Sequence, residues 1–435
     1  MNILYDDFGC YYIGFFIAEL NMELHSKQFL PLFSDNTATI LHEYIHYLQD
    51  ISTLRGISSI SSLSKKLQLV FSQANNPEYQ FVLPIRSAQI KEMNPIAAFN
   101  DEVLTIEKGD NQIPQRKINK IDRIVLETDN MQMLIEEYSD AVHPSAKGYQ
   151  NVEIYYDKLK CSYKFGSDSI SESMAYLSER VLCNSFERNN ELPYNACELL
   201  CSFSFPNLSL SPTILIAICE LSLMGENSGK LFYDILHNIN SQKLSFNSVK
   251  EFEHTYSHLF NQLCQELSAK YNEVMECLDF LYPTDIPVSE SDVVLVNSRM
   301  KERITRGIHY RKKQGLFIAK AIESKNLKAI EKMFESLGIP LLIDKNKDLF
   351  SDDSLLPLLA PLAIYNSFFS EREEERKCFL YDYCKRQSVP IYDESYCAIT
   401  PWQQVNGEKI CPYALYIRRY ALNPNNIKLR NHNHH

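Results

Sequence analysis

Residues 36–56 (NTATILHEYIHYLQDISTLRG) carry the clearest helical pattern of the chain. Their apolar side chains recur with a helical period and cover an arc of roughly 160°. They form two adjacent stripes, Ile40, Tyr44, Tyr47, Ile51 and Leu41, Ile45, Leu48. The polar side chains in the remaining gap are His42, His46, Gln49 and Thr53, with Glu43 and Asp50 at its edges. Because Asp35 and Asn36 are N-cap residue types and Gly56 favours a helix end, we expect an amphipathic helix between them.

The rest of the pattern predicts an α+β, predominantly α-helical fold with a small sheet before this helix. Expected strands are 3–5, 11–18, 118–127 and 152–163. A second helix should run from Gly56 to about Gln73. From Glu187 onward we expect a large helical region, with helices at 193–203, 211–224, 228–240, 247–281, 291–324 and 326–337.

Composition narrows the class of protein. The net charge of −11 argues against nucleic acid as the main partner, because phosphate binding requires a basic surface. The apolar run 11–18 follows two aspartates and not a basic segment, so it does not resemble a signal peptide. The run 211–224 is interrupted by Glu220 and is too short to span a bilayer. We therefore expect no membrane partner. The 12 cysteines are scattered, which favours a reducing, cytoplasmic location.

The motif His42-Glu43-Tyr44-Ile45-His46 carries the candidate chemistry. Side chains four residues apart share one helix face, so both imidazoles can reach one metal ion. Glu43 lies one step round the same turn, where it can accept a proton from water beside that ion. Asp50 or Gln49 could orient a ligating imidazole. The alternative is an ordinary amphipathic surface helix with two solvated histidines.

This motif resembles the active-site helix of zincin metallopeptidases, in which the two histidines bind zinc and the glutamate is the general base. The resemblance covers this helix and one further short segment. It implies that His42 and His46 bind Zn²⁺, that Glu43 is catalytic, and that the substrate is a protein or peptide. It also implies a preceding sheet whose edge strand binds the substrate backbone. The metzincin extension is excluded, because glycine does not follow three residues after His46, nor histidine six residues after it.

A third zinc ligand is required, because catalytic zinc usually takes three protein ligands. In the gluzincin pattern it is a glutamate from a later helix, and Glu172-Ser-Met-Ala resembles that pattern. We therefore expect Glu172 as the third metal ligand, with Asp168 or Glu179 as alternatives. Two observations favour a structural role for Glu172. Ser169–Glu172 has capping-box spacing, and the apolar stripe containing Ile170 and Met174 places Glu172 on the opposite, exposed face.

The domain organisation follows from this assignment. We expect a zincin-like metallopeptidase domain at 1–185, a helical domain at 186–340 and a mixed C-terminal region at 341–435. The 126 positions that separate His46 from Glu172 exceed the usual gluzincin interval, which implies an inserted subdomain at about 75–160.

Three further sets of residues are candidates for a metal-binding or catalytic role. His254 and His258 are four apart, but an amphipathic helix explains them better. The basic run 299–313 is typical of a solvated helix face, although its His309 or Tyr310 could stabilise an oxyanion. Four late cysteines suggest a structural zinc site, but their spacing lacks a close C-x₂₋₄-C pair and favours buried free thiols. They are Cys378, Cys384, Cys397 and Cys411.

The sequence thus predicts a zinc-dependent peptidase that uses Glu43 as general base. Two alternatives remain open: a non-catalytic helical scaffold with a structural or vestigial metal site, and a metal-dependent hydrolase whose substrate is not a peptide.

Overall fold

Helices dominate the computed structural model, and the α+β, predominantly helical class is confirmed. The structure describes residues 3–6, 9–24, 37–74, 76–110, 116–117, 121–127, 138, 151–157, 161–183, 191–284, 290–350, 359–386, 393–407 and 411–430. The predicted N-cap at Asp35 or Asn36 lies outside these residues. Among the described helices, none combines the length and apolar content that crossing a bilayer requires.

The helices fall into three groups along the chain. The first group is α2 (Thr37–Ser52), α3 (Leu54–Ser72), α4 (Ser87–Met93), α5 (Pro95–Lys108) and α7 (Ser167–Cys183). The second is α8 (Ala196–Ser204), α9 (Pro212–Ser222), α10 (Ser228–Gln242), α11 (Val249–Thr255), α12 (Ser257–Ala269), α13 (Tyr271–Leu281), α14 (Glu290–Gln314), α15 (Phe317–Glu323) and α16 (Leu327–Leu337). The third is α17 (Leu359–Phe369), α18 (Glu373–Arg376), α19 (Tyr381–Arg386), α20 (Glu394–Ile399), η3 (Pro401–Asn406), α21 (Pro412–Arg419) and η4 (Pro424–Asn426).

Twelve strands form four small sheets in the described parts of the chain. The largest has the order β1-β2-β3-β10-β11, with β3 and β10 parallel and the other neighbours antiparallel. Its strands are β1 (Ile3–Asp6), β2 (Gly9–Tyr12), β3 (Ile17–Leu20), β10 (Leu341–Ile343) and β11 (Leu349–Phe350). The others are β12 (Ile427–Leu429) with β4 (Phe81–Leu83), β5 (Arg116–Lys117) with β9 (Glu191–Leu192), and β6 (Ile121–Glu127), β7 (Asn151–Tyr156) and β8 (Cys161–Phe165).

Two strand predictions need correction. Residues 11–18 do not form one strand, because Gly14 and Phe16 adopt positive φ values of 80° and 59° and turn the chain into a β2–β3 hairpin. Residues 152–163 likewise belong to two paired strands, β7 and β8. The predicted helix 247–281 is three helices and 291–324 is two, since the second interval turns at Gly315, whose φ is 70°.

The first helix ends at Ser52 and not at Gly56. Thr53 takes an extended conformation, and its hydroxyl caps α3 by accepting the Gly56 N–H at 3.2 Å. Gly56 is therefore inside the first turn of α3. A Cβ there would lie 2.3 Å from the Asp50 Cα atom, so glycine is needed for the close approach at the α2–α3 corner.

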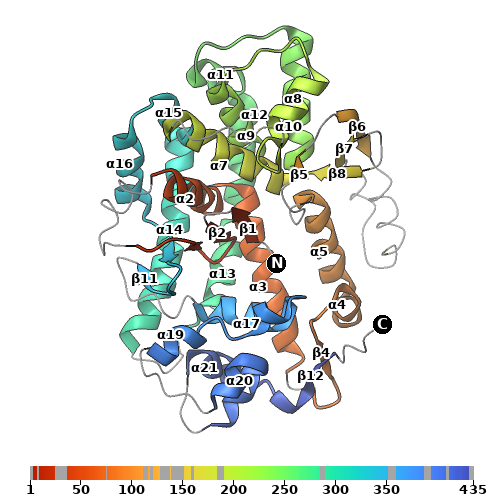
Figure 1. Ribbon diagram of the computed structural model, residues 1–435, viewed down its shortest axis with the longest axis vertical. Coiled ribbons are helices and arrows are strands. Elements are labelled where there is room, and N and C mark those ends of the chain that lie inside the picture. Colours follow the sequence, from red (N-terminus) through yellow and green to blue (C-terminus); the bar gives the residue numbers. More distant parts are fainter. Residues whose placement is uncertain are drawn as a thin grey trace.

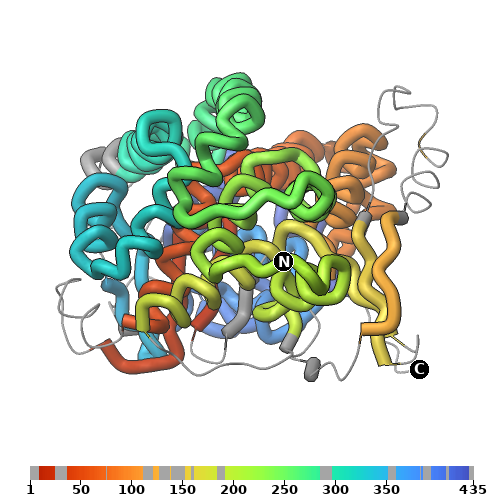
Figure 2. Tube along the Cα trace, turned by 90° about the horizontal axis from the view of Figure 1, so that it is seen from above, coloured from red at the N-terminus to blue at the C-terminus, as the bar shows by residue number. Residues whose placement is uncertain are grey.

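The tertiary structure buries α2 on all sides. It packs against α7, α14, α3 and β2, and every residue from Ile40 to Ser52 is buried. In Figure 1, α2 and α3 lie in the middle of the molecule, the helices α8 to α12 lie at the upper end, and α17, α20 and α21 lie at the lower end. The β6–β7–β8 sheet stands at one side of the helical body (Figure 2). The expected domain boundaries stay predictions.

Candidate metal centre

The two motif histidines lie one turn apart on α2. Their ring centroids are 5.0 Å apart, and His42 and His46 are only 2% and 1% exposed. The alternative of two solvated histidines on a surface helix is therefore wrong. The opposite face of α2 is apolar and packed as well, so this helix has no solvent-facing side for the histidines to occupy.

Glu172 of α7 faces both imidazoles. Its Oε2 atom lies 3.2 Å from His42 Nε2 and 3.6 Å from His46 Nε2. One donor atom from each of the three residues lies within 4.8 Å of the others, and this is the cluster of the described residues that could hold a metal ion. Two donors about 2.0–2.2 Å from one tetrahedral ion are themselves about 3.4 Å apart, so this spacing fits such an ion.

The structural interpretations of Glu172 are wrong. Helix α7 begins at Ser167, so Ser169 is already inside the helix and cannot be its N-cap. The Ser169 hydroxyl instead lies 2.7 Å from that of Tyr163. Glu172 is 2% exposed, because α7 is covered on all sides from Ser167 to Ser178 and its polar face is buried against α2.

The outer nitrogen of each imidazole has its own oxygen partner. Gln49 Oε1 lies 2.9 Å from His46 Nδ1, and the Gln49 amide nitrogen donates to the Ser171 carbonyl at 3.2 Å. Glu179 Oε2 lies 3.5 Å from His42 Nδ1. Because the Gln49 Oε1 atom can only accept, His46 Nδ1 carries the proton and the His46 Nε2 lone pair is directed at Glu172. Gln49 therefore has the orienting contact predicted for Gln49 or Asp50.

The ionisation states suit a metal. Burial lowers the pKa of His46, which keeps the imidazole neutral, although the nearby Glu172 carboxylate opposes this shift. Burial alone would raise the pKa of Glu172, but His46 and His42 outweigh it and lower that pKa to about 2. Neutral imidazole and ionised carboxylate are the forms that bind a divalent cation.

Glu43 lies on the side of α2 that packs on the hairpin. Its side chain is 1% exposed, and a Cβ at Gly9 of β2 would lie 2.7 Å from its Oε1 atom. Only glycine leaves this space for the carboxylate. Two aromatic rings that the sequence did not single out also border the histidines: Tyr11 lies 5.9 Å from His46 and Tyr194 lies 6.2 Å from His42, centroid to centroid.

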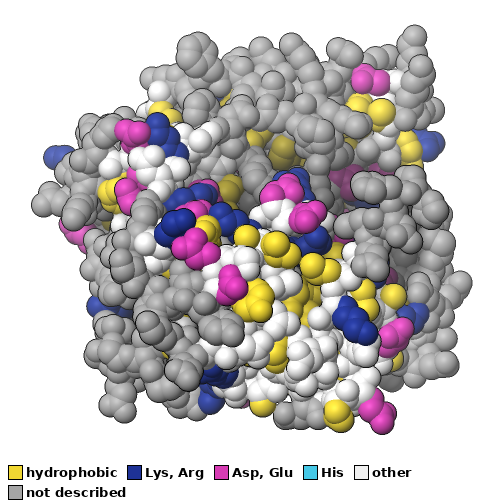
Figure 3. Space-filling model, turned by 60° about the horizontal axis from the view of Figure 1, so that its bottom comes forward, with side chains coloured by type: hydrophobic (Ala, Val, Ile, Leu, Met, Phe, Trp, Pro, Cys, Tyr) yellow, Lys and Arg dark blue, Asp and Glu magenta, His cyan; other side chains and the backbone are white. Residues whose placement is uncertain are grey.

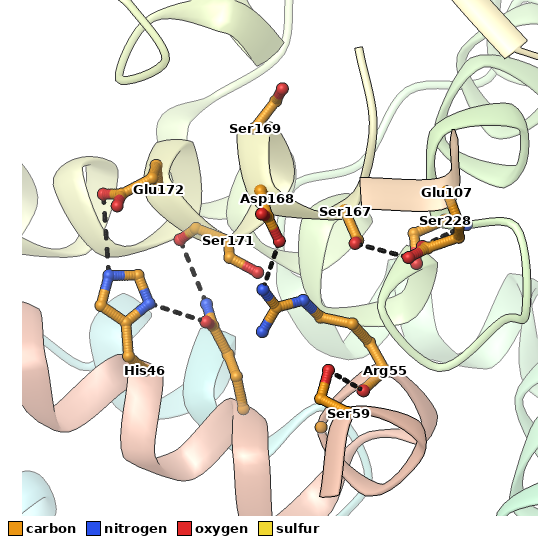
Figure 4. A network of polar contacts seen from close by, with 12 residues as sticks. His46, Arg55, Ser59, Glu107, Ser167, Asp168, Ser169, Ser171, Glu172 and Ser228 are labelled. Atoms are coloured by element: carbon orange, nitrogen blue, oxygen red, sulfur yellow. Dashed lines mark hydrogen bonds and ion pairs between the residues drawn. The ribbon is translucent and has the colours of Figure 1, made fainter. Parts of the chain in front are cut away.

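Asp168 and Asp50 lie outside the cluster. Asp168 accepts a 2.5 Å hydrogen bond from the Arg55 guanidinium (Figure 4), and Asp50 accepts the Gly14 N–H at 2.7 Å. Asp168 is thus wrong as a third ligand, because its carboxylate is engaged by a buried cation. Glu179 contacts the cluster only through the outer nitrogen of His42.

The other sequence candidates lie elsewhere. His254 and His258 are exposed and belong to different helices, α11 and α12. His309 is exposed, and the Tyr310 ring packs on Phe317 at 4.9 Å. The tyrosines that border the cluster are instead Tyr11 of β2 and Tyr194 in the segment after β9, and no motif pointed to them. Comparisons with protein-family models, curated proteins and solved structures found no match for this chain.

Proposed function

We propose that the protein is a zinc-dependent peptidase whose metal is held by His42, His46 and Glu172. The observation that supports this most directly is the single Glu172 oxygen, 3.2 Å and 3.6 Å from the two Nε2 atoms. Two imidazoles and a carboxylate at tetrahedral spacing, on a helix that carries H-E-x-x-H, are the donor set of a catalytic zinc site with one open position.

In this mechanism the residues of the chain orient the metal ligands and transfer protons. Zinc supplies Lewis acidity, which polarises the scissile carbonyl and makes nearby water more acidic. Glu43 accepts the proton of the attacking water and then passes it to the leaving amine. Gln49 and Glu179 hold the imidazoles in one tautomer and orientation. Gly9 leaves space for the Glu43 carboxylate beside the β2 backbone.

The burial of the cluster favours a second candidate, a non-catalytic protein with a structural metal. His42, Glu43, His46 and Glu172 are each at most 2% exposed, whereas a catalytic site must admit its substrate. A cavity of about 310 Å³ between α3 and α5 is lined by Arg55, Asp101 and Glu107 but by none of these four residues. Peptide hydrolysis therefore requires an opening movement over the metal ligands.

Metal analysis of the purified chain tests the proposal. We expect zinc in the wild type and a loss of about one zinc ion per chain in His46→Ala and in Glu172→Gln. His309→Ala, an exposed histidine on α14, is the matched control and should keep the wild-type metal content. Equal zinc in the wild type and His46→Ala would end the metallopeptidase proposal, and so would iron in place of zinc. Zinc loss without any peptidase activity would favour the structural-metal candidate.

A further inference from the structure

The cavity between α3 and α5, two helices that pack beside each other (Figure 1), has a volume of about 310 Å³. It reaches from the surface to the interior. Among the residues that line it, the Lys65 side chain is 55% exposed, whereas Arg55 is 3% exposed. Pockets for small molecules have volumes of about 300–1,000 Å³, so this cavity can hold a small ligand. None of the residues of the proposed metal centre lines it.

Two buried groups of opposite charge line the cavity, one from each helix. Arg55 belongs to α3, and Glu107, which is 5% exposed, belongs to α5. Figure 4 shows both side chains in one polar network. Burial raises the pKa of the Glu107 carboxyl, although the Ser167 hydroxyl and then Arg55 oppose this rise. A further cation beside Glu107 would favour its ionised form.

The Arg55 guanidinium has a hydrogen-bond donor to spare. Its Nη2 atom donates to Asp168 at 2.5 Å, and its Nη1 atom lies 3.9 Å from Asp50 Oδ1. Its Nε atom is buried and donates to none of the residues that the structure describes. A buried N–H without an acceptor is unfavourable, and a carboxylate is the acceptor that a guanidinium binds most strongly. Arg55 can therefore bind the carboxylate of a ligand while it keeps Asp168.

The Glu107 carboxylate has an acceptor to spare. Its Oε2 atom accepts the Ser167 hydroxyl at 2.7 Å. Its Oε1 atom accepts the Ser228 N–H at 3.4 Å, a distance at which an N–H···O hydrogen bond is weak. Oε1 can therefore accept a second, charged donor such as an ammonium group.

The other cations that line the cavity already have carboxylate partners. Lys66 pairs with Asp101 at 2.5 Å and so joins α3 to α5. Lys65 and Lys270 share Glu273. On the face of the molecule that Figure 3 shows, the described acidic and basic side chains are also intermixed, without a large region of one sign. These charges favour a ligand that carries both signs over one with a net charge.

Aliphatic side chains line much of the remaining wall. They include Leu54 of α3, Ile90 of α4 and Leu104 of α5. Apolar walls with a few convergent polar groups are typical of small-molecule sites, in which the apolar part of the ligand is removed from water.

We propose that the cavity binds a free α-amino acid with an aliphatic side chain. The amino-acid carboxylate would accept from Arg55 Nε, and its ammonium group would donate to Glu107 Oε1. Its side chain would pack against the aliphatic wall. Because the site uses no residue of the proposed metal centre, it goes beyond the peptidase proposal and does not depend on it.

Calorimetric titration of the full-length protein with L-leucine tests the site. L-Leucine amide lacks the carboxylate and N-acetyl-L-leucine lacks the ammonium group, so each leaves one buried charge of the cavity without its partner. We expect L-leucine to bind, and each analogue to bind at least about tenfold more weakly. The His46→Ala variant should bind L-leucine as the wild type does, so failure of the metal proposal would not affect this test.

Two variants place the ligand in the cavity. Glu107→Gln should weaken L-leucine binding by at least about tenfold, whereas Glu153→Gln, at a buried glutamate outside the cavity, should not change it. Ser58→Phe should abolish binding, because Ser58 is a half-buried residue of the cavity wall and the added ring would fill the space. If Glu107→Gln does not fold, the three probes on the wild type still decide.

Four results would overturn the proposal. They are no binding of L-leucine at millimolar concentrations, equal affinity for L-leucine and either analogue, unchanged binding in Ser58→Phe, and tighter binding of trileucine than of L-leucine. The last result would assign the cavity to a peptide and not to a free amino acid.

Discussion

The Arg55 guanidinium on α3 and the Asp168 carboxylate on α7 meet at 2.5 Å, and both side chains are at most 3% exposed. Arg55 belongs to the first turn after the α2–α3 corner, and Asp168 is one helical turn before Glu172. The ion pair therefore ties α7, which carries the proposed third ligand, to the start of α3, directly after the helix that carries both histidines (Figure 4).

Asp168→Asn should destabilise the fold. It removes the nearest counter-charge of the buried Arg55 and leaves the Asp50 carboxylate, 3.9 Å away, and Glu107. Removing one partner of a buried ion pair costs about 3–5 kcal/mol, so we expect a loss of that order in the free energy of unfolding, measured by urea denaturation. The control is Glu371→Gln, which breaks the exposed pair with Arg86 and should cost at most about 1 kcal/mol. Equal losses in the two variants would contradict a special role for the buried pair.

Glu43→Gln should keep the metal and abolish turnover. The amide has nearly the same shape as the carboxylate, but it cannot accept the proton of the attacking water, and loss of a general base costs about 10²–10⁴-fold in kcat. Zinc content and peptide cleavage are measured on the same preparation. Glu153→Gln, at a buried glutamate on β7, is the control and should cleave as the wild type does. Wild-type turnover in Glu43→Gln would rule out Glu43 as the base.

Gly9→Ala should reduce turnover without releasing zinc. The added methyl group would lie 2.7 Å from Glu43 Oε1, so the carboxylate must move away from β2. A displacement of about 1 Å at a catalytic group costs on the order of 10²-fold in rate. Gly225→Ala is a matched control, since its methyl group would crowd Leu231 Cδ2 at the same 2.7 Å away from the cluster. An unaffected rate in Gly9→Ala would show that the position of Glu43 beside β2 does not matter.

Gln49→Leu and Glu179→Gln should weaken metal binding. Leucine removes the oxygen that lies 2.9 Å from His46 Nδ1, and the amide at position 179 replaces the carboxylate that lies 3.5 Å from His42 Nδ1. Loss of such outer partners typically costs about 10–100-fold in metal affinity. Zinc dissociation constants from chelator competition measure the effect, with Gln68→Leu on α3 as the control. Unchanged affinity in both variants would mean that these contacts do not orient the ligands.

Asp50 should make stability fall as the pH rises. Burial raises its pKa to about 7 in the folded protein, although Arg55 and the Gly14 N–H oppose this shift. The pKa of this side chain in the unfolded chain is about 3.9. At pH values between about 3.9 and about 7, the folded state therefore holds a proton that the unfolded chain has lost. The stabilising contribution is therefore complete below the unfolded pKa and is lost as the pH rises through the folded one.

The pH dependence of the unfolding free energy is compared with that of the Asp50→Asn variant, whose amide side chain does not titrate. We expect the wild-type unfolding free energy to fall with pH more steeply than that of the variant, by up to about 1.4 kcal/mol per pH unit. Urea denaturation at several pH values between about 4 and 7 checks this. Groups shared by both proteins cancel in the comparison. Parallel pH profiles would contradict a raised pKa at Asp50.

The sequence by itself determined the helical class, most helix positions and the histidine pair. These features depend on residues that are close in the sequence. The period of the apolar residues defines a helix, and a spacing of four places His42 and His46 on one face of it. The sequence could not predict the helix ends that depend on tertiary packing. In the sequence Gly56 resembles a residue that ends a helix, but in the structure the close approach of the Asp50 backbone explains why glycine is there.

Only the tertiary structure decided which acidic group meets the histidines. Three acidic residues lie on α7, and the sequence around them does not distinguish their roles. In the structure Glu172 faces both imidazoles, Asp168 pairs with Arg55 and Glu179 lies beside the outer nitrogen of His42. Helix α7 is buried all round, so its apolar stripe does not show which side faces α2.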